Sequence, residues 1–136
     1  MMAMASEVLV LSYAACGTCK KALKWLGAHG IAYTLRDVTT QPPTRAELAE
    51  WIPRSNLPVR KWLNTSGQSY RALGKEKITQ ATDDTLVSWL ASDGKLVKRP
   101  VVIAGTKGPG RRVLVGFSEE TYEGTFGKAT FSKATA

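Results

Sequence analysis

Residues 7–38, which read EVLVLSYAACGTCKKALKWLGAHGIAYTLRDV, decide the fold of this chain. The apolar and β-branched run 7–13 predicts a buried strand, and residues 31–38 alternate as a second strand does. Between them a helix is predicted over 18–29, with Gly30 as its stop signal. The apolar residues of this helix recur at helical spacing: Ala22, Leu23, Trp25 and Leu26. A strand, a helix and a strand within about 30 residues predict a βαβ unit.

The two cysteines of the chain lie at the first strand-to-helix turn of this unit, in the order Cys16, Gly17, Thr18, Cys19. Thiols at this spacing can close a disulfide, and the unpaired amides at a helix start stabilise a thiolate. We therefore expect a redox or nucleophilic site at this turn. No metal is expected. A structural zinc site would need two ligands besides the cysteine pair, and the chain has one histidine and no third cysteine.

The middle of the chain, residues 41–94, is expected to form a helical insertion. Thr44 and Glu47 have the spacing of a capping box, and Pro53 is expected to stop the helix that they begin. Further helices are expected over 59–63 and 82–94.

Strand character returns after the insertion. Two strands are expected over 96–103 and 113–117, joined by a glycine-rich loop over 105–112, and a last short helix begins at Ser118. A βαβ unit, a helical insertion and a ββα unit, with the cysteine pair at the first turn, predict an α/β fold with a thioredoxin-like sheet. Pro100 is either an edge-strand proline or the cis proline that faces the cysteine pair in thioredoxin-like sites.

The length of 136 residues suits one globular domain. We expect a single thioredoxin-like domain over residues 1–136, with core segments 6–40 and 95–126 around the insertion. The small and polar tail, 127–136, is expected to be frayed.

In this order and spacing, several motifs make the chain similar to the arsenate reductase (ArsC)/Spx family over nearly its whole length. The motifs are Cys16 to Ala22, Trp25 with Leu26, Ile31 to Asp37, Asn64 to Gly67 with Tyr70 and Arg71, Leu90 to Gly94, Lys98 to Pro100, and Val115 to Phe117.

The resemblance implies a mechanism. In the glutathione-dependent arsenate reductases the first cysteine attacks arsenate, arginines bind the oxyanion, and glutathione with glutaredoxin completes the reduction. Cys16 matches that nucleophile, and Arg60 and Arg99 match two of the arginines, whose guanidinium groups bind an oxyanion or a carboxylate bidentately. The alternative for Arg60 is a solvent-facing arginine on a helix. Amides of Gly17 and Thr18 would add anion contacts.

The chain also departs from those reductases. Gly116 stands where they have a third arginine, and Ser12 stands where they have a histidine. Cys19 matches a serine in the glutathione-dependent enzymes and a cysteine in Spx-like members.

Two functions stay open. The first is a thiol oxidoreductase in which Cys19 resolves an adduct on Cys16, with glutathione, glutaredoxin or thioredoxin as reductant and no bound cofactor. The second is an Spx-like regulator whose disulfide tunes binding to the C-terminal domain of the RNA polymerase alpha subunit.

The net charge is +8, but the basic residues are spread along the chain without a long basic run or an RNA-binding pattern. We therefore expect an oxyanion or a glutathione adduct as a partner, and no direct binding of nucleic acid. Neither a signal peptide nor a membrane-spanning run is recognisable, so a cytoplasmic protein is expected.

Overall fold

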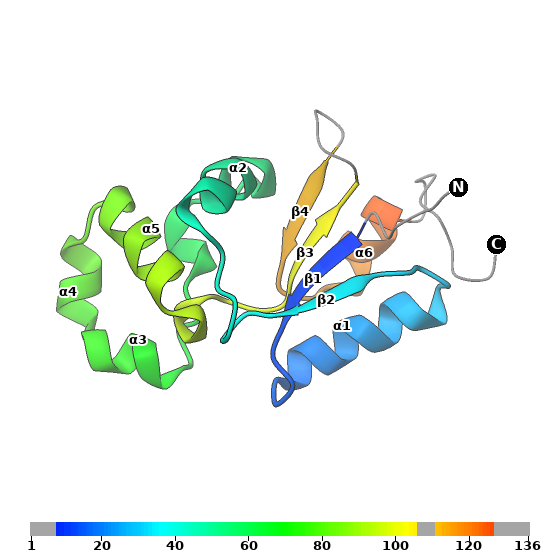
Figure 1. Cartoon of the computed structure of the whole chain (residues 1–136), viewed down its shortest axis with the longest axis horizontal. Coiled ribbons are helices and arrows are strands. Elements are labelled where there is room, and N and C mark those ends of the chain that lie inside the picture. Colours follow the sequence, from blue (N-terminus) through cyan, green and yellow to red (C-terminus); the bar gives the residue numbers. More distant parts are fainter. Residues whose placement is uncertain (1–7, 106–110, 127–136) are drawn as a thin grey trace. The chain divides into compact units, whose positions relative to one another are not determined.

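A computed structural model describes residues 8–105 and 111–126 (Figure 1). The chain forms two compact units. Unit 1 comprises residues 1–36 and 99–136, and unit 2 comprises residues 37–98. The predicted tail, 127–136, and most of the predicted glycine-rich loop lie outside the described residues. Within the described part of the chain, no helix is long and apolar enough to cross a membrane.

The sheet has four strands in the order β2-β1-β3-β4. Their bounds are β1 Val8–Ser12, β2 Thr34–Asp37, β3 Val101–Ala104 and β4 Arg112–Val115. β3 is antiparallel to both β1 and β4, with Val102 opposite Val10 on one side and Leu114 on the other. The predicted α/β fold with a helical insertion is confirmed.

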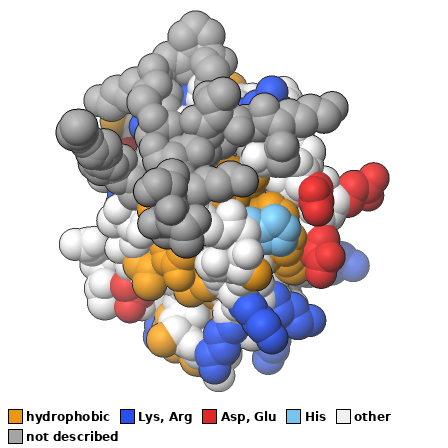
Figure 2. Space-filling view, turned by 90° about the vertical axis from the view of Figure 1, so that its right-hand side faces the viewer, with side chains coloured by type: hydrophobic (Ala, Val, Ile, Leu, Met, Phe, Trp, Pro, Cys, Tyr) orange, Lys and Arg blue, Asp and Glu red, His pale blue; other side chains and the backbone are white. Residues whose placement is uncertain are grey.

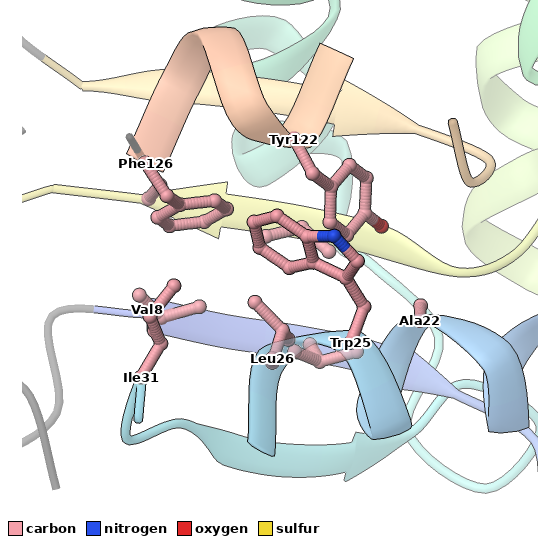
Figure 3. Close-up of a cluster of buried hydrophobic side chains, with 10 residues drawn as sticks. Val8, Ala22, Trp25, Leu26, Ile31, Tyr122 and Phe126 are labelled. Atoms are coloured by element: carbon pink, nitrogen blue, oxygen red, sulfur yellow. The ribbon is translucent and has the colours of Figure 1, made fainter. Parts of the chain in front are cut away.

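Two helices, α1 (Gly17–Ala28) and α6 (Glu119–Phe126), share one hydrophobic core with the sheet in unit 1. Side chains at alternate positions of β1 and β3 point into this core, which is the period-two arrangement of a strand. Figure 3 shows Trp25 of α1 reaching toward Tyr122 and Phe126 of α6. The Trp25 and Tyr122 rings meet edge to face at 5.4 Å between centroids. These contacts hold α1, and the cysteine turn at its start, against the sheet.

Unit 2 is helical. Its elements are α2 (Arg45–Ser55), η1 (Val59–Trp62), α3 (Gln68–Leu73), α4 (Lys75–Gln80), α5 (Asp83–Ser92) and η2 (Gly94–Leu96). Leu48, Trp62, Leu86 and Leu90 are completely buried. Gly94 allows a close chain approach, because a Cβ atom there would lie 1.7 Å from the carbonyl oxygen of Val38. A larger residue at position 94 would therefore force the backbone apart.

The capping box at α2 is confirmed. The Thr44 hydroxyl accepts a hydrogen bond from the Glu47 amide at 3.0 Å, and the Glu47 carboxylate accepts one from the Thr44 amide at 2.9 Å. The predicted stop at Pro53 is wrong, because α2 continues to Ser55 and ends where Asn56 takes a left-handed conformation. A proline in the last turn costs the helix only one hydrogen bond, so the helix tolerates it.

The strand predicted over 96–103 is shorter than expected. Leu96 closes η2, Val97 forms an isolated bridge with Leu63, and regular pairing begins only at Val101. Pro100 has no N–H to donate, which favours a strand that starts after it. Helices α3 and α4 were not predicted, because each has only 6 residues and is too short to show a helical period.

Candidate functional site

The cysteine turn connects the end of β1 to the start of α1. The Cys16 amide donates a hydrogen bond to the carbonyl oxygen of Tyr13 at 2.9 Å, which closes the turn. Cys16 is the N-cap of α1, and its sulfur accepts a hydrogen bond from the Cys19 amide at 3.3 Å. The sulfur therefore occupies the place where a helix start favours negative charge.

The pKa of Cys16 is lowered from its ordinary value. Burial of the half-buried sulfur acts in the opposite direction, but the hydrogen bond from the Cys19 thiol, the backbone amides of Cys19 and Thr18 and the positive charge of Arg99 outweigh it. Cys16 is thus the more acidic thiol of the pair and ionises more readily to the thiolate, which is the form that attacks an electrophile.

Cys19 has the opposite character. It is buried, with 1% of its surface exposed. Burial first, and then the hydrogen bond to Cys16 and the negative charge of that sulfur, raise the pKa of Cys19 to about 11 against the lowering effect of contacts with Tyr13 and Ser12. Both cysteines are free thiols in this structure. The turn therefore pairs a thiol of lowered pKa with a buried thiol of raised pKa.

Arg99 and Pro100 lie on the segment that leads into β3. The Arg99–Pro100 peptide bond is cis, and the carbonyl oxygen of Pro100 accepts a hydrogen bond from the Gly116 amide at 2.8 Å. Because β3 is a central strand of the sheet, the edge-strand alternative for Pro100 is wrong. The Arg99 guanidinium carbon lies 4.8 Å from the centroid of the Tyr13 ring, and its charge acts on Cys16. The structure thus brings Arg99 to the cysteine turn.

Arg60 lies on η1 in unit 2, where it holds the end of α4. Its guanidinium donates hydrogen bonds to the carbonyl oxygens of Ile78, Thr79 and Ala81, at 2.7, 3.2 and 2.6 Å. The first two carbonyls belong to the last turn of α4 and the third to its C-cap residue, so they lack the regular partners of a helix interior and accept donors from outside the helix. Arg60 is exposed on η1, as the solvent-facing alternative expected, but its hydrogen bonds to these carbonyls were not predicted. Anion binding by Arg60 stays a prediction.

Gly17 and Thr18 are the first residues of α1 and both are exposed. The Thr18 amide already contributes to the lowered pKa of Cys16. A Cβ atom at Gly17 would meet nothing within 4 Å, so packing does not require glycine there. Anion contacts through these amides stay a prediction.

Two contributors to the site escaped the sequence analysis. The Tyr13 ring lies against Arg99, and the Ser12 side chain bonds to Cys19. From the sequence, Ser12 was identified only as a departure from the reductases, which have a histidine at the matching position. The sequence pointed to Tyr13 only in that it is an aromatic residue at the end of a predicted strand, three positions before Cys16.

A separate groove of about 330 Å³ lies on the α1 side of unit 1. Its lining residues are Lys21, Lys24, Trp25, Ala28, Phe117 and Glu119. On the face shown in Figure 2, hydrophobic side chains are bordered by basic groups on one side and acidic groups on another. The groove contains none of the predicted site residues. Among the described residues, no cluster of three or more His, Cys, Asp or Glu could hold a metal ion.

A sheet of this order, with a cysteine pair at the first strand-to-helix turn and a cis proline before a central strand, defines a thiol protein of the thioredoxin-like class. The chain belongs to the ArsC family, whose model matches residues 11–125.

Three curated relatives illustrate the range of this similarity. YusI of Bacillus subtilis, an uncharacterised protein, is 43% identical over 112 residues, covering 82% of this chain and 91% of YusI. The arsenate reductase of Escherichia coli K12 is 30% identical, covering 72% of this chain and 69% of the reductase. The regulatory protein MgsR of Bacillus subtilis is 28% identical, covering 76% of this chain and 82% of MgsR.

A solved structure of an ArsC family related protein from Bacteroides fragilis has the same fold. It is 45% identical, covers 90% of this chain and 99% of its own, and superposes with a TM-score of 0.82. The fold and the family are thus established, while the relatives' names divide between enzymes and a regulator.

Proposed function

We propose that this protein is a thiol oxidoreductase in which Cys16 is the nucleophile and Cys19 resolves the adduct. The observation that carries the proposal is the opposite acidity of two thiols on one helical turn, with the charge of Arg99 acting on the first of them. A structural thiol pair has no need of this difference.

In the first step, the Cys16 thiolate attacks an electrophile. With a mixed disulfide, its sulfur bonds to one sulfur of the substrate and the other leaves as a thiolate. With arsenate, the Cys16 sulfur bonds to arsenic and one oxygen leaves as water after taking up protons. Arg99 and the helix start favour an anionic substrate in either case.

In the second step, Cys19 attacks the Cys16 sulfur and a disulfide forms between them. The bond from Cys16 to the substrate breaks, and two electrons leave with the reduced thiol or with arsenite. The proton of Cys19 passes to the leaving group. The disulfide is then reduced by thioredoxin, or by glutathione with glutaredoxin, which are reductants of the cytoplasm.

The order of these steps follows from the causes of the Cys19 pKa. Burial is the largest of them and persists, but the hydrogen bond to Cys16 and the charge of its thiolate vanish once Cys16 carries an adduct. The pKa of Cys19 then falls. The adduct therefore removes two of the causes that raise the pKa of Cys19 and so favours its attack on the Cys16 sulfur.

Turnover of arsenate and of a glutathionylated peptide tests the proposal, with thioredoxin and with glutaredoxin as recycling systems. Wild type is expected to turn over at least one substrate, and Cys16→Ser is expected to have no activity. Absence of turnover by wild type with every substrate and recycling system would refute the proposal.

A regulator is the second candidate, favoured by the similarity to MgsR and by the cysteine at position 19. In this function the disulfide changes a surface that binds the RNA polymerase alpha subunit. Purified polymerase is expected to bind the oxidised and reduced forms with different affinity, and Cys19→Ser is expected to remove the difference. Equal or absent binding of both forms would eliminate this candidate.

A further inference from the structure

Tyr13 contacts both cysteines and Arg99. Its carbonyl oxygen accepts the Cys16 amide at 2.9 Å, and its backbone bonds to the Cys19 sulfur. Its ring lies 4.8 Å from the guanidinium carbon of Arg99. One residue thus joins the proposed nucleophile, the proposed resolving thiol and the cationic group, although the proposed reaction gives it no step of its own.

We propose that Tyr13 is a positioning residue, whose ring holds the Arg99 guanidinium where its charge acts on Cys16. The proposal deepens the proposed function and rests on it for the substrate class, which is an anionic electrophile. Tyr13 would then contribute, through Arg99, to the acidity of Cys16 and to the preference of the site for anions.

The physical argument begins with the flexibility of arginine. An arginine side chain has several rotatable bonds, and its charge acts on a neighbouring sulfur only while it stays near. The face of an aromatic ring attracts a guanidinium group and favours one flat orientation of it. Tyr13 and Arg99 are both half-buried, so this attraction is not lost to full solvation. The ring therefore restricts the positions that the Arg99 guanidinium takes up near the cysteine turn.

Substitutions at position 13 separate the ring from the backbone. The carbonyl that accepts the Cys16 amide is present in every variant, so the turn keeps its hydrogen bond. Tyr13→Leu removes the aromatic face, Tyr13→Phe keeps it without the hydroxyl, and Tyr13→Trp enlarges it. Tyr70→Leu in unit 2 is the matched control for the same change of side chain.

The measurement is the alkylation rate of Cys16 against pH, followed by mass spectrometry with neutral iodoacetamide and with anionic iodoacetate. Tyr13→Leu is expected to raise the pKa of Cys16 and to slow alkylation about threefold at pH values below that pKa. It is also expected to slow iodoacetate more than iodoacetamide. Tyr13→Phe and Tyr13→Trp are expected to restore the wild-type profile, and Tyr70→Leu to match it.

A double substitution shows whether Tyr13 acts through Arg99. In an Arg99→Ala background, Tyr13→Leu is expected to have no further effect on the pH profile. An equal effect in both backgrounds, or a Tyr13→Phe profile like that of Tyr13→Leu, would overturn the proposal. If Tyr13→Leu does not fold, the alkylation rate of Cys16 in Tyr13→Trp tests the proposal instead. A rate slower than that of wild type in this variant overturns the proposal. Because alkylation needs no turnover, failure here is distinct from failure of the oxidoreductase function.

Discussion

Cys16 and Cys19 are chemically alike in sequence but not in their surroundings. The first caps a helix beside a guanidinium group, and the second is buried behind it. Helix start, burial and mutual hydrogen bonding push the two pKa values apart. In the proposed reaction this difference divides the work, because the half-buried Cys16 starts the reaction and the buried Cys19 completes it.

Alkylation of the reduced protein should distinguish the two thiols. We expect a limiting amount of iodoacetamide at neutral pH to label Cys16 and to leave Cys19 unmodified, because only Cys16 is both accessible and acidic. Peptide mass spectrometry gives the site of modification. Equal labelling of both cysteines in the folded protein would contradict the assignment.

The raised pKa of Cys19 also predicts a loss of stability in alkaline solution. The ordinary pKa of a thiol, which applies in the unfolded chain, is 9.0, whereas burial raises the pKa of Cys19 in the folded protein to about 11. Its contribution to stability is therefore complete below pH 9.0 and is lost as the pH rises toward 11. Urea unfolding against pH should show a smaller alkaline loss for Cys19→Ala than for wild type. Parallel curves for the two proteins would contradict the prediction.

Among the structural elements, α4 depends on a side chain from another element. Arg60 supplies donors to three carbonyls at its end. We expect Arg60→Ala to lower the free energy of unfolding by about 1–2 kcal/mol, and Arg60→Lys to recover part of it, since lysine cannot reproduce the planar fork. Urea unfolding measures both variants. Unchanged stability together with lost arsenate turnover would assign Arg60 to anion binding instead.

The start of α2 offers a second test. Thr44→Ala removes the hydroxyl that accepts the Glu47 amide, and we expect a loss of about 1 kcal/mol of stability. Thr44→Ser keeps the acceptor and is the control, with stability close to that of wild type. Equal stability of the alanine and serine variants would show that the capping box contributes nothing.

How far the sequence predicted each element depended on the type of signal it carried. The first strand and α1 have long apolar patterns, and the predicted cysteine turn lies where they meet. Helices α3 and α4 are short, and the contacts that stabilise them come from residues distant in sequence, such as Arg60. The ring of Tyr13 above Arg99 joins positions far apart in the chain. The local periodicity of a sequence does not predict contacts between residues that are distant in the chain.

For the molecule as a whole, the family is shared by enzymes and a regulator, so fold alone does not assign its function. Unit 1 carries both cysteines, Arg99 and Pro100. The net charge of +8 favours anionic partners at long range, whereas the lowered pKa of Cys16 comes from the hydrogen bonds at the helix start together with the nearby charge of Arg99. The central claim is that Cys16 forms an adduct which Cys19 then resolves.

Trapping of that adduct tests the claim most directly. Reduced wild type and Cys19→Ser are mixed with glutathione disulfide, quenched with acid at successive times and weighed by mass spectrometry. We predict that Cys19→Ser accumulates one glutathione on Cys16, whereas wild type passes through this species to a Cys16–Cys19 disulfide. A stable glutathione adduct on wild type, or an adduct on Cys19 in Cys16→Ser that forms equally fast, would contradict the account.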